Sequence, residues 1–506
     1  MLKEGEVVEP ASRRLFLGML AFLIVEVIVL SAVRGPEERF DRFAFQDSGG
    51  ELIRQEFWRR GFAPTVDFGY LYGLLPMLVG DAWYRAFGLT PSAFRGLMFG
   101  CSLATAWGLA RFAAARNLGP AGLAMIALAV PDMLQTNTIS LVHNLEPALL
   151  THALAEHARG RRDRALALAT ACVFVKPSMA YVYGLFLVIA IFSRKESRKA
   201  WVRMLAPAAA TGAILAVVLG GVFGLRPLVN TVFPVSGLSA YQDTGYGFFR
   251  GSGRTFWILP EAGVRDYFRY EVGFWLIGSA CLTAGGASAI VRLVRGAGDV
   301  DDELAACCAG LHLAFVSLFF GNRGSWVYYF VVLILGLATL SRRSGAYALG
   351  IGFLALLLLV NDGSKLKSIR QDWANLQRGR ETLNLWATPL EREEWAKVRE
   401  LTAGSEPVLL ADYEGITLFD KTFARPVSYF DPGRVQRRFL EAKARQISNA
   451  HLIVCVVTDD WRGFGFWPEL RAALEGCEVA WHGRLYTIYR RIKPPRRGLR
   501  RLKPAA

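Results

Sequence analysis

The sequence has few charged residues and lacks the signatures of several protein classes. Asp, Glu, Lys and Arg make up 20% of its 506 residues, whereas 53% are hydrophobic, a balance that soluble domains rarely show. The sequence contains no nucleotide-binding glycine loop. It also shows no internal repeat, and repeated halves are frequent in transporters. Its seven cysteines have no metal-ligand spacing, which counts against a cysteine-based metal centre.

Long apolar runs are abundant instead. Four examples are long enough to cross a hydrocarbon core of about 30 Å, at residues 15–33, 204–223, 272–291 and 345–361. The first is no signal peptide, because it lacks a small-residue cleavage site and Arg34 with a charged loop follows it directly. The sequence therefore predicts a mostly α-helical polytopic membrane protein with about ten or eleven membrane segments.

The formal net charge of +16 is spread over short loops between the apolar runs. Such a value can indicate nucleic-acid binding, but dispersed basic residues follow the positive-inside pattern of membrane proteins. We therefore expect membrane lipids and lipid phosphates as partners, and no nucleic acid. Arg13 and Arg14 precede the first apolar run, which places the N-terminus in the cytoplasm.

The later basic clusters constrain how the chain crosses the bilayer. If all are cytoplasmic, the segments between them cross an even number of times. The half-hydrophobic stretch 70–87 is then an interfacial helix on the outer leaflet, within a long first external loop, residues 34–91. The stretch 165–192 becomes two half-helices that meet at Lys176, since Pro177 breaks helices and a buried lysine needs a polar cavity. The clusters lie at Arg111/Arg116, 159–162, 194–203, Arg292/Arg295 and Arg342-Arg343.

The composition changes sharply after the membrane part, which we assign to residues 1–361. The sequence pattern over residues 362–492 predicts an external soluble α/β domain, and residues 493–506 are expected to form a basic tail. Cys455 and Cys477 could pair there in an oxidising compartment. The expected helices span 390–401 and 435–447, and the expected strands span 408–411, 452–457, 478–481 and 485–489.

Polar residues expected on the external side or at its membrane edge could carry chemistry. Carboxylates and cations on one membrane face suit glycosyl transfer. A carboxylate can accept the proton of an attacking hydroxyl, and Lys or Arg can stabilise a leaving phosphate. The candidates are Asp47 with Asp67, His143 with Glu146, Lys176, and Arg323 with Tyr328.

Each candidate also has a structural interpretation. Asp47 could be the N-cap of the helical run that follows it, and Asp67 could close a turn. His143 and Glu146 could cap a helix that enters the bilayer, whereas a structural Lys176 would need a partner at that depth. Arg323 could be an ordinary loop arginine, and Tyr328 could belong to an interfacial aromatic belt.

The run from Asp47 through residues 61–70, continued by 73–76 and 87–88, resembles the first external loop of GT-C fold glycosyltransferases. These polytopic enzymes use polyprenyl-phosphate sugars and include relatives of protein mannosyltransferases and of lipid A aminoarabinose transferases. The basic turn and broken span over 159–177 look like a family feature. Residues 321–329 are similar to a late Arg and Tyr-Tyr element of some members.

The resemblance implies a GT-C architecture with Asp47 at the catalytic acidic position and with Lys176 and Arg323 near the donor phosphate. Many members carry two adjacent acidic residues at the first site, whereas this chain has Gln46 before Asp47. That departure favours a metal-independent general base, and we expect no cofactor. We further expect Asp67 and the remaining candidates to bind or orient substrate.

The sequence thus predicts an inverting hexosyl- or pentosyltransferase of the bacterial inner (plasma) membrane. It would move a sugar from a polyprenyl-phosphate donor to a hydroxyl of a glycan, lipid or protein on the external face. A transporter or flippase of lipid-linked sugars would share the cavity and the cations but would not need a base at Asp47. A non-catalytic assembly protein would leave Lys176 without a partner.

Overall fold

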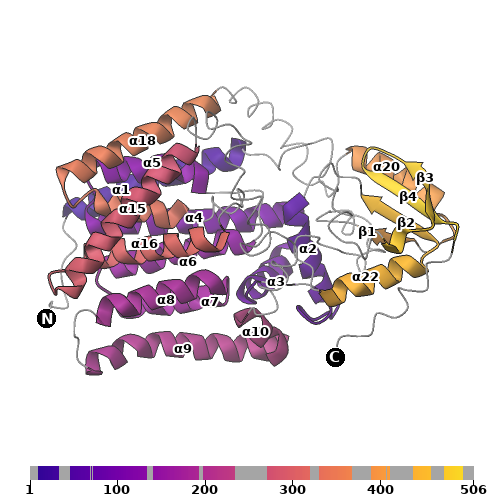
Figure 1. Cartoon of the computed structure of the whole chain (residues 1–506), viewed down its shortest axis with the longest axis horizontal. Coiled ribbons are helices and arrows are strands. Elements are labelled where there is room, and N and C mark those ends of the chain that lie inside the picture. Colours follow the sequence, from indigo (N-terminus) through magenta and orange to yellow (C-terminus); the bar gives the residue numbers. More distant parts are fainter. Residues whose placement is uncertain are drawn as a thin grey trace.

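The computed structural model shows a bundle of helices with a small sheet domain beyond one end (Figure 1). This fold confirms the predicted mostly helical polytopic protein with a C-terminal α/β part. The structure describes residues 10–33, 46–68, 70, 72–133, 141–192, 198–233, 271–319, 330–366, 389–405, 407–410, 437–456 and 472–493.

Within these residues, four helices are long and apolar enough to cross a membrane by length and composition. They are α1 (Pro10–Val33), α4 (Pro91–Arg116), α9 (Arg198–Phe223) and α15 (Glu271–Val294). Three of them contain runs expected from the sequence. The fourth expected run lies in α18 (Gly345–Leu366), which extends five residues beyond the predicted boundary at 361. The expected total of about ten or eleven segments stays a prediction.

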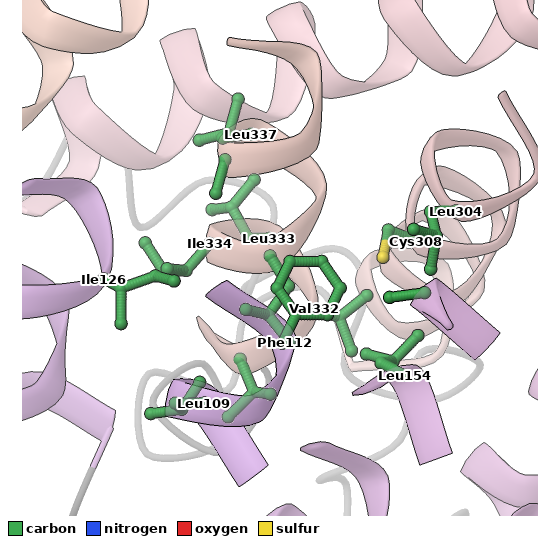
Figure 2. Packing of buried hydrophobic residues seen from close by; sticks show 14 of the residues in the cluster. Leu109, Phe112, Ile126, Leu154, Leu304, Cys308, Val332, Leu333, Ile334 and Leu337 are labelled. Carbon is green, nitrogen blue, oxygen red and sulfur yellow. The ribbon is translucent and has the colours of Figure 1, made fainter. Parts of the chain in front are cut away.

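The other helices of the bundle are shorter. They are α2 (Gln46–Arg59), α3 (Leu75–Phe87), α5 (Pro120–Met133), α6 (Leu141–Ala158), α7 (Arg162–Val173), α8 (Pro177–Phe192), α10 (Leu225–Val232), α16 (Val300–Phe319) and α17 (Phe330–Leu340). Figure 2 shows side chains from α4, α5, α6, α16 and α17, among them Phe112, Leu154 and Val332, converging in the apolar core. Helices α4 and α6 approach closely where Gly108 faces Thr151, as small residues permit in membrane bundles.

Helices α7 and α8 form a hairpin that enters the bundle and returns. α7 has 12 residues and rises about 18 Å, well short of a hydrocarbon core of about 30 Å. Arg162 at its start shares a pocket with Lys199 and Arg203 near the start of α9, so α7 and α9 begin at one end. The predicted break at Lys176 is confirmed.

Basic residues from several helices gather at this same end, which we call the arginine-rich end. Arg116 and Arg342 lie 2.6 and 3.4 Å from Asp301, and Arg292 and Arg343 lie 2.6 and 2.8 Å from Asp302. The shared partners confirm that these basic clusters lie at one end of the bundle. That this end is cytoplasmic stays a prediction.

The predicted interfacial helix over 70–87 begins later than expected. α3 starts at Leu75 because the backbone before it pairs with another segment. Gly73 N donates to Val175 O at 3.0 Å, and Leu75 N donates to Phe174 O at 2.9 Å. α3 also packs against α2, whose Gln55 Nε2 donates to Met77 O at 3.2 Å. Figure 1 places α2, α3 and α10 at the end of the bundle nearer the sheet.

The C-terminal part contains a four-stranded sheet in the order β1-β2-β4-β3. β1 (Val408–Leu410) pairs in parallel with β2 (Leu452–Val456), whereas β4 (Tyr486–Arg491) pairs antiparallel with β2 and with β3 (Cys477–His482). Alternate residues point to opposite faces. Trp395 of α20 (Pro389–Leu401) packs on one face, and Ala444 and Ile447 of α22 (Arg437–Asn449) pack on the other. All six expected elements are present within a few residues.

The possible disulfide between Cys455 and Cys477 is excluded by the sheet order. The two residues lie on β2 and β3 with β4 between them, and both are free. Two strand spacings separate their backbones by about 9–10 Å, whereas a disulfide spans at most about 7 Å between Cα atoms.

Candidate functional site

The tip of the α7–α8 hairpin, Phe174–Lys176, is the centre of the candidate site. α8 begins with Pro177, which lacks a backbone donor and is favoured in a first helical turn. The tip closes on α7, with Lys176 N donating to Cys172 O at 2.8 Å. Backbone groups left free by such a break must find partners inside the protein. The carbonyls of Phe174 and Val175 find them in the segment before α3.

That segment can approach so closely because residue 73 is glycine. A Cβ added to Gly73 would lie 1.9 Å from Phe174 O, well inside van der Waals contact. The approach places Tyr72 beside α6, where its hydroxyl shares a 3.2 Å hydrogen bond with His143 Nε2. Tyr70 supports the same segment, since its hydroxyl donates to Gly73 O at 3.1 Å.

Lys176 meets a carboxylate from α6. Its Nζ lies 3.7 Å from Glu146 Oε2, and the two residues are 9% and 3% exposed. His143 and Glu146 are separated by three positions on α6, so they share one helix face. We call Tyr72, His143, Glu146 and Lys176 the polar cluster.

The capping interpretation of Glu146 is wrong, because α6 begins at Leu141 and Glu146 is its sixth residue. Among the residues that the structure describes, Glu146 Oε1 has no hydrogen-bond partner. The Glu146 carboxylate is therefore buried with spare acceptor capacity, which is costly for a charged group. An anion or a hydroxyl that reached the polar cluster would find a cation and an acceptor there.

Asp47 lies on α2. It is the second residue of the helix, and the N-cap interpretation stays an alternative at this helix start. An acidic residue in the first turn is favourable toward the helix dipole. Glu51 and Arg54 of the same helix are three positions apart, so they share one helix face. Glu51 and Arg54 are buried, and the Arg54 guanidinium lies 5.9 Å from the Tyr70 ring centroid.

The remaining candidates are placed differently. Asp67 is exposed, and its carboxylate accepts from Ala63 N at 2.6 Å while Asp67 N donates to Ala63 O. The structure thus assigns it the turn-closing role, and its part in substrate binding stays a prediction. Arg323 and Tyr328 lie outside the described residues.

Sequence reasoning missed Glu51, Arg54 and Tyr72 as members of this region. In the sequence, Glu51 and Arg54 follow Asp47 by four and seven positions, the spacing of one helix face. That spacing was a usable signal for Glu51 and Arg54. Tyr72 had no such signal, because its position depends on the backbone pairing of Gly73 with a segment a hundred residues away.

The described residues contain no group of three or more His, Cys, Asp and Glu side chains able to hold a metal ion. The polar cluster offers one imidazole and one carboxylate beside a lysine, which suits an anion better than a cation. Metal-independent catalysis stays a prediction, made from Gln46 and Asp47.

Comparison with known proteins gives one structural likeness. No family model matches the chain, and no curated protein matches it. The chain is similar to ArnT from Cupriavidus metallidurans, whose crystal structure contains bound undecaprenyl phosphate. The likeness has a TM-score of 0.44 at 15% identity and covers 93% of this chain and 98% of that chain.

Proposed function

We propose that the chain is a membrane glycosyltransferase that moves a sugar from a polyprenyl-phosphate donor to an acceptor hydroxyl. The observation that carries the proposal is the buried pair of Lys176 and Glu146 at the tip of a broken helix. A lysine at this depth is costly. It is useful where a lipid-linked phosphate must be bound near the membrane surface.

In the proposed reaction, the acceptor oxygen attacks the anomeric carbon of the donor sugar. Asp47 takes the hydroxyl proton as the new carbon–oxygen bond forms. The bond between the anomeric carbon and the phosphate oxygen breaks, and the polyprenyl phosphate leaves with the electron pair. Attack opposite the leaving group inverts the anomeric configuration. Lys176 stabilises the charge that develops on the phosphate.

The arrangement of elements supports a shared site for these two residues. α2 is fixed to α3 by Gln55, and the segment before α3 is fixed to the hairpin tip by two backbone hydrogen bonds. Helix α2, which carries Asp47, is thus connected to the hairpin tip, which carries Lys176, through α3 and the segment that leads into it. Glu146 holds Lys176 before the donor arrives, and the phosphate then replaces the carboxylate as the partner of the ammonium group.

The roles of the other candidates follow from this scheme. His143 and Tyr72 would donate or accept hydrogen bonds at the sugar, and Arg323 would be a second cation at the phosphate. Tyr328 and Asp67 would contact the sugar or the acceptor. The protein would lie in the bacterial inner membrane with its reaction on the external face.

The test is turnover of a panel of polyprenyl-phosphate sugars by the purified protein in proteoliposomes. Asp47→Asn should lower transfer by about 10²–10⁴-fold, the usual contribution of a general base, while donor binding stays near that of the native protein. Lys176→Met should weaken donor binding by about 10–100-fold, as expected for one charge-assisted hydrogen bond.

Glu56→Gln is the matched control for Asp47→Asn. Glu56 lies on the same helix and pairs with Arg60 at 3.0 Å near the surface, where such pairs contribute little. Full transfer by Asp47→Asn would overturn the assignment of the base. Movement of a labelled donor between leaflets without any transfer would favour the flippase instead.

A further inference from the structure

A second site lies at the arginine-rich end, away from the polar cluster. A pocket of about 380 Å³ opens between the start of α7 and the start of α9, and its lining includes Arg162, Asp163, Lys199 and Arg203. Gly160, in the turn before α7, also lines the pocket. A Cβ there would meet no atom within 4 Å, so this part of the lining has space beside it.

The charges in this pocket are unequally compensated. Arg162 is held by Glu303 through two hydrogen bonds, of 3.0 and 2.8 Å, and so carries little free charge. Lys199 and Arg203 are exposed and have no ion-pair partner within the described chain. Because they are four positions apart, they occupy one face of α9. Against Asp163, the pocket retains a net charge of about one positive unit.

The pocket also lies at the edge of an apolar surface. The candidate membrane span of α9 begins at Lys199, and almost none of that span is buried in the protein. Val202 and Leu205 are 62% and 41% exposed within the same two turns as the cations. A ligand in the pocket would therefore have its polar part against Lys199 and Arg203 and an apolar part along α9.

We propose that this pocket binds the headgroup of a monoanionic phospholipid from the leaflet at the arginine-rich end. A phosphodiester carries one negative charge, which matches the excess positive charge of the pocket, and acyl chains can lie along the exposed side of α9. Basic pockets between membrane helices are known to hold anionic headgroups. The site is independent of the proposed transfer reaction, because none of its residues belongs to the polar cluster.

The experiment uses the full chain in nanodiscs with equal phosphatidylcholine and phosphatidylglycerol, followed by native mass spectrometry of the lipids retained. The native protein should retain phosphatidylglycerol in preference. Lys199→Gln with Arg203→Gln should lower that preference by about 30-fold, or about fivefold for each cation removed. Transfer activity of the double variant with any accepted donor should remain native-like.

Arg164→Gln is the matched control, because Arg164 is exposed on α7 but does not line the pocket. It should leave the preference unchanged. Size-exclusion elution and thermal unfolding would verify that each variant is folded. Equal loss in Arg164→Gln, or no loss in the folded double variant, would overturn the proposal.

A competition arm separates the lipid from soluble phosphate. Millimolar inorganic phosphate should displace little phosphatidylglycerol, because it has no apolar part to lie on α9. If it displaced the lipid fully, the pocket would be a phosphate site and the lipid assignment would be wrong.

Discussion

At the residue scale, Gly73 decides whether the polar cluster can form. Its amide donates to Val175 O, and the space where a side chain would begin is occupied by Phe174 O. No other residue type could bring this backbone so close to the hairpin tip. Tyr72 reaches His143 through the same approach.

Gly73→Ala should therefore separate the two segments. We expect a loss of about 2–3 kcal/mol in the free energy of unfolding, corresponding to two backbone hydrogen bonds, together with weaker donor binding at Lys176. Thermal or denaturant unfolding in detergent measures the first effect. Gly100→Ala is the control, because a Cβ there meets no atom within 4 Å. Equal stability of the two variants would contradict the role of Gly73.

A second residue-scale feature is the buried Lys443 on α22. Its Nζ donates to Leu409 O at 2.6 Å and to Gln446 Oε1 at 3.2 Å. Burial lowers the pKa of Lys443 from 10.5 to about 7. The unfolded chain keeps the proton between these two values, so folding releases it there. Below about pH 7 the free energy of unfolding of the sheet domain is therefore lowered by the full cost of burying this charge. It increases as the pH rises from about 7 toward 10.5.

We expect the free energy of unfolding around β2 to rise by up to about 1.4 kcal/mol per pH unit across that window. Lys443→Met should abolish this slope, while Lys397→Met, at an exposed pair with Glu400, should keep it. Hydrogen exchange of the β2 amides in the full chain, corrected for intrinsic rates, measures the slope. A native-like slope in Lys443→Met would refute this origin of the pH dependence.

At the element scale, single carboxylates connect helices to distant segments. Glu394 of α20 accepts from the backbone amides of Arg484, Leu485 and Tyr486 at 2.7, 2.8 and 3.3 Å. It thereby holds the turn between β3 and β4 against the helix. Trp395 beside it packs on Tyr486, with ring centroids 5.4 Å apart. The helix and the hairpin should stabilise each other.

Glu394→Gln removes the charge and one acceptor while keeping the shape of the side chain. The expected loss is about 1–3 kcal/mol in the stability of the sheet domain, because backbone donors lose a charged partner. Protection of the β4 amides from hydrogen exchange reports it. Glu393→Gln, at the exposed neighbour, should change protection by less than about 0.5 kcal/mol. A comparable effect of both variants would show that Glu394 has no special role.

At the scale of the whole molecule, the two ends of the bundle carry different chemistry. α4 runs from Pro91, just after α3, to Arg116 at the arginine-rich end, and its 26 residues span about 39 Å. The polar cluster, at the tip that follows the 12-residue α7, lies about 18 Å along that helix from the phospholipid pocket at the arginine-rich end. The sheet domain lies beyond the end that holds α2 and α3 (Figure 1).

This separation predicts opposite labelling of two exposed positions. Arg164→Cys at the arginine-rich end should face the cytoplasm by the positive-inside rule, whereas Glu393→Cys in the sheet domain should face outside. A membrane-impermeant maleimide on intact spheroplasts should label Glu393→Cys directly and Arg164→Cys after permeabilisation alone. The native protein, whose described cysteines are buried or partly buried, gives the background. Labelling of both from one side would refute the topology.

The sequence predicted the elements well where local physics determines them. Apolar length identified three of the four helices that are long enough to cross a membrane, and alternation identified the strands of the sheet within one or two residues. Pro177 beside Lys176 predicted the helix break, because proline cannot donate and a buried lysine needs a polar environment. The basic clusters predicted one common end, which shared carboxylates such as Asp301 and Asp302 confirm.

The composition of the site was decided by tertiary structure. That Lys176 faces Glu146, and that Tyr72 faces His143, depends on contacts between segments far apart in the chain, which no local pattern encodes. Asp67 differs, because its carboxylate closes a local turn with Ala63, a role that the sequence already allowed. The late start of α3 and the separation of Cys455 from Cys477 follow from backbone pairing. By itself the sequence determined which residues could act; packing decided which of them meet.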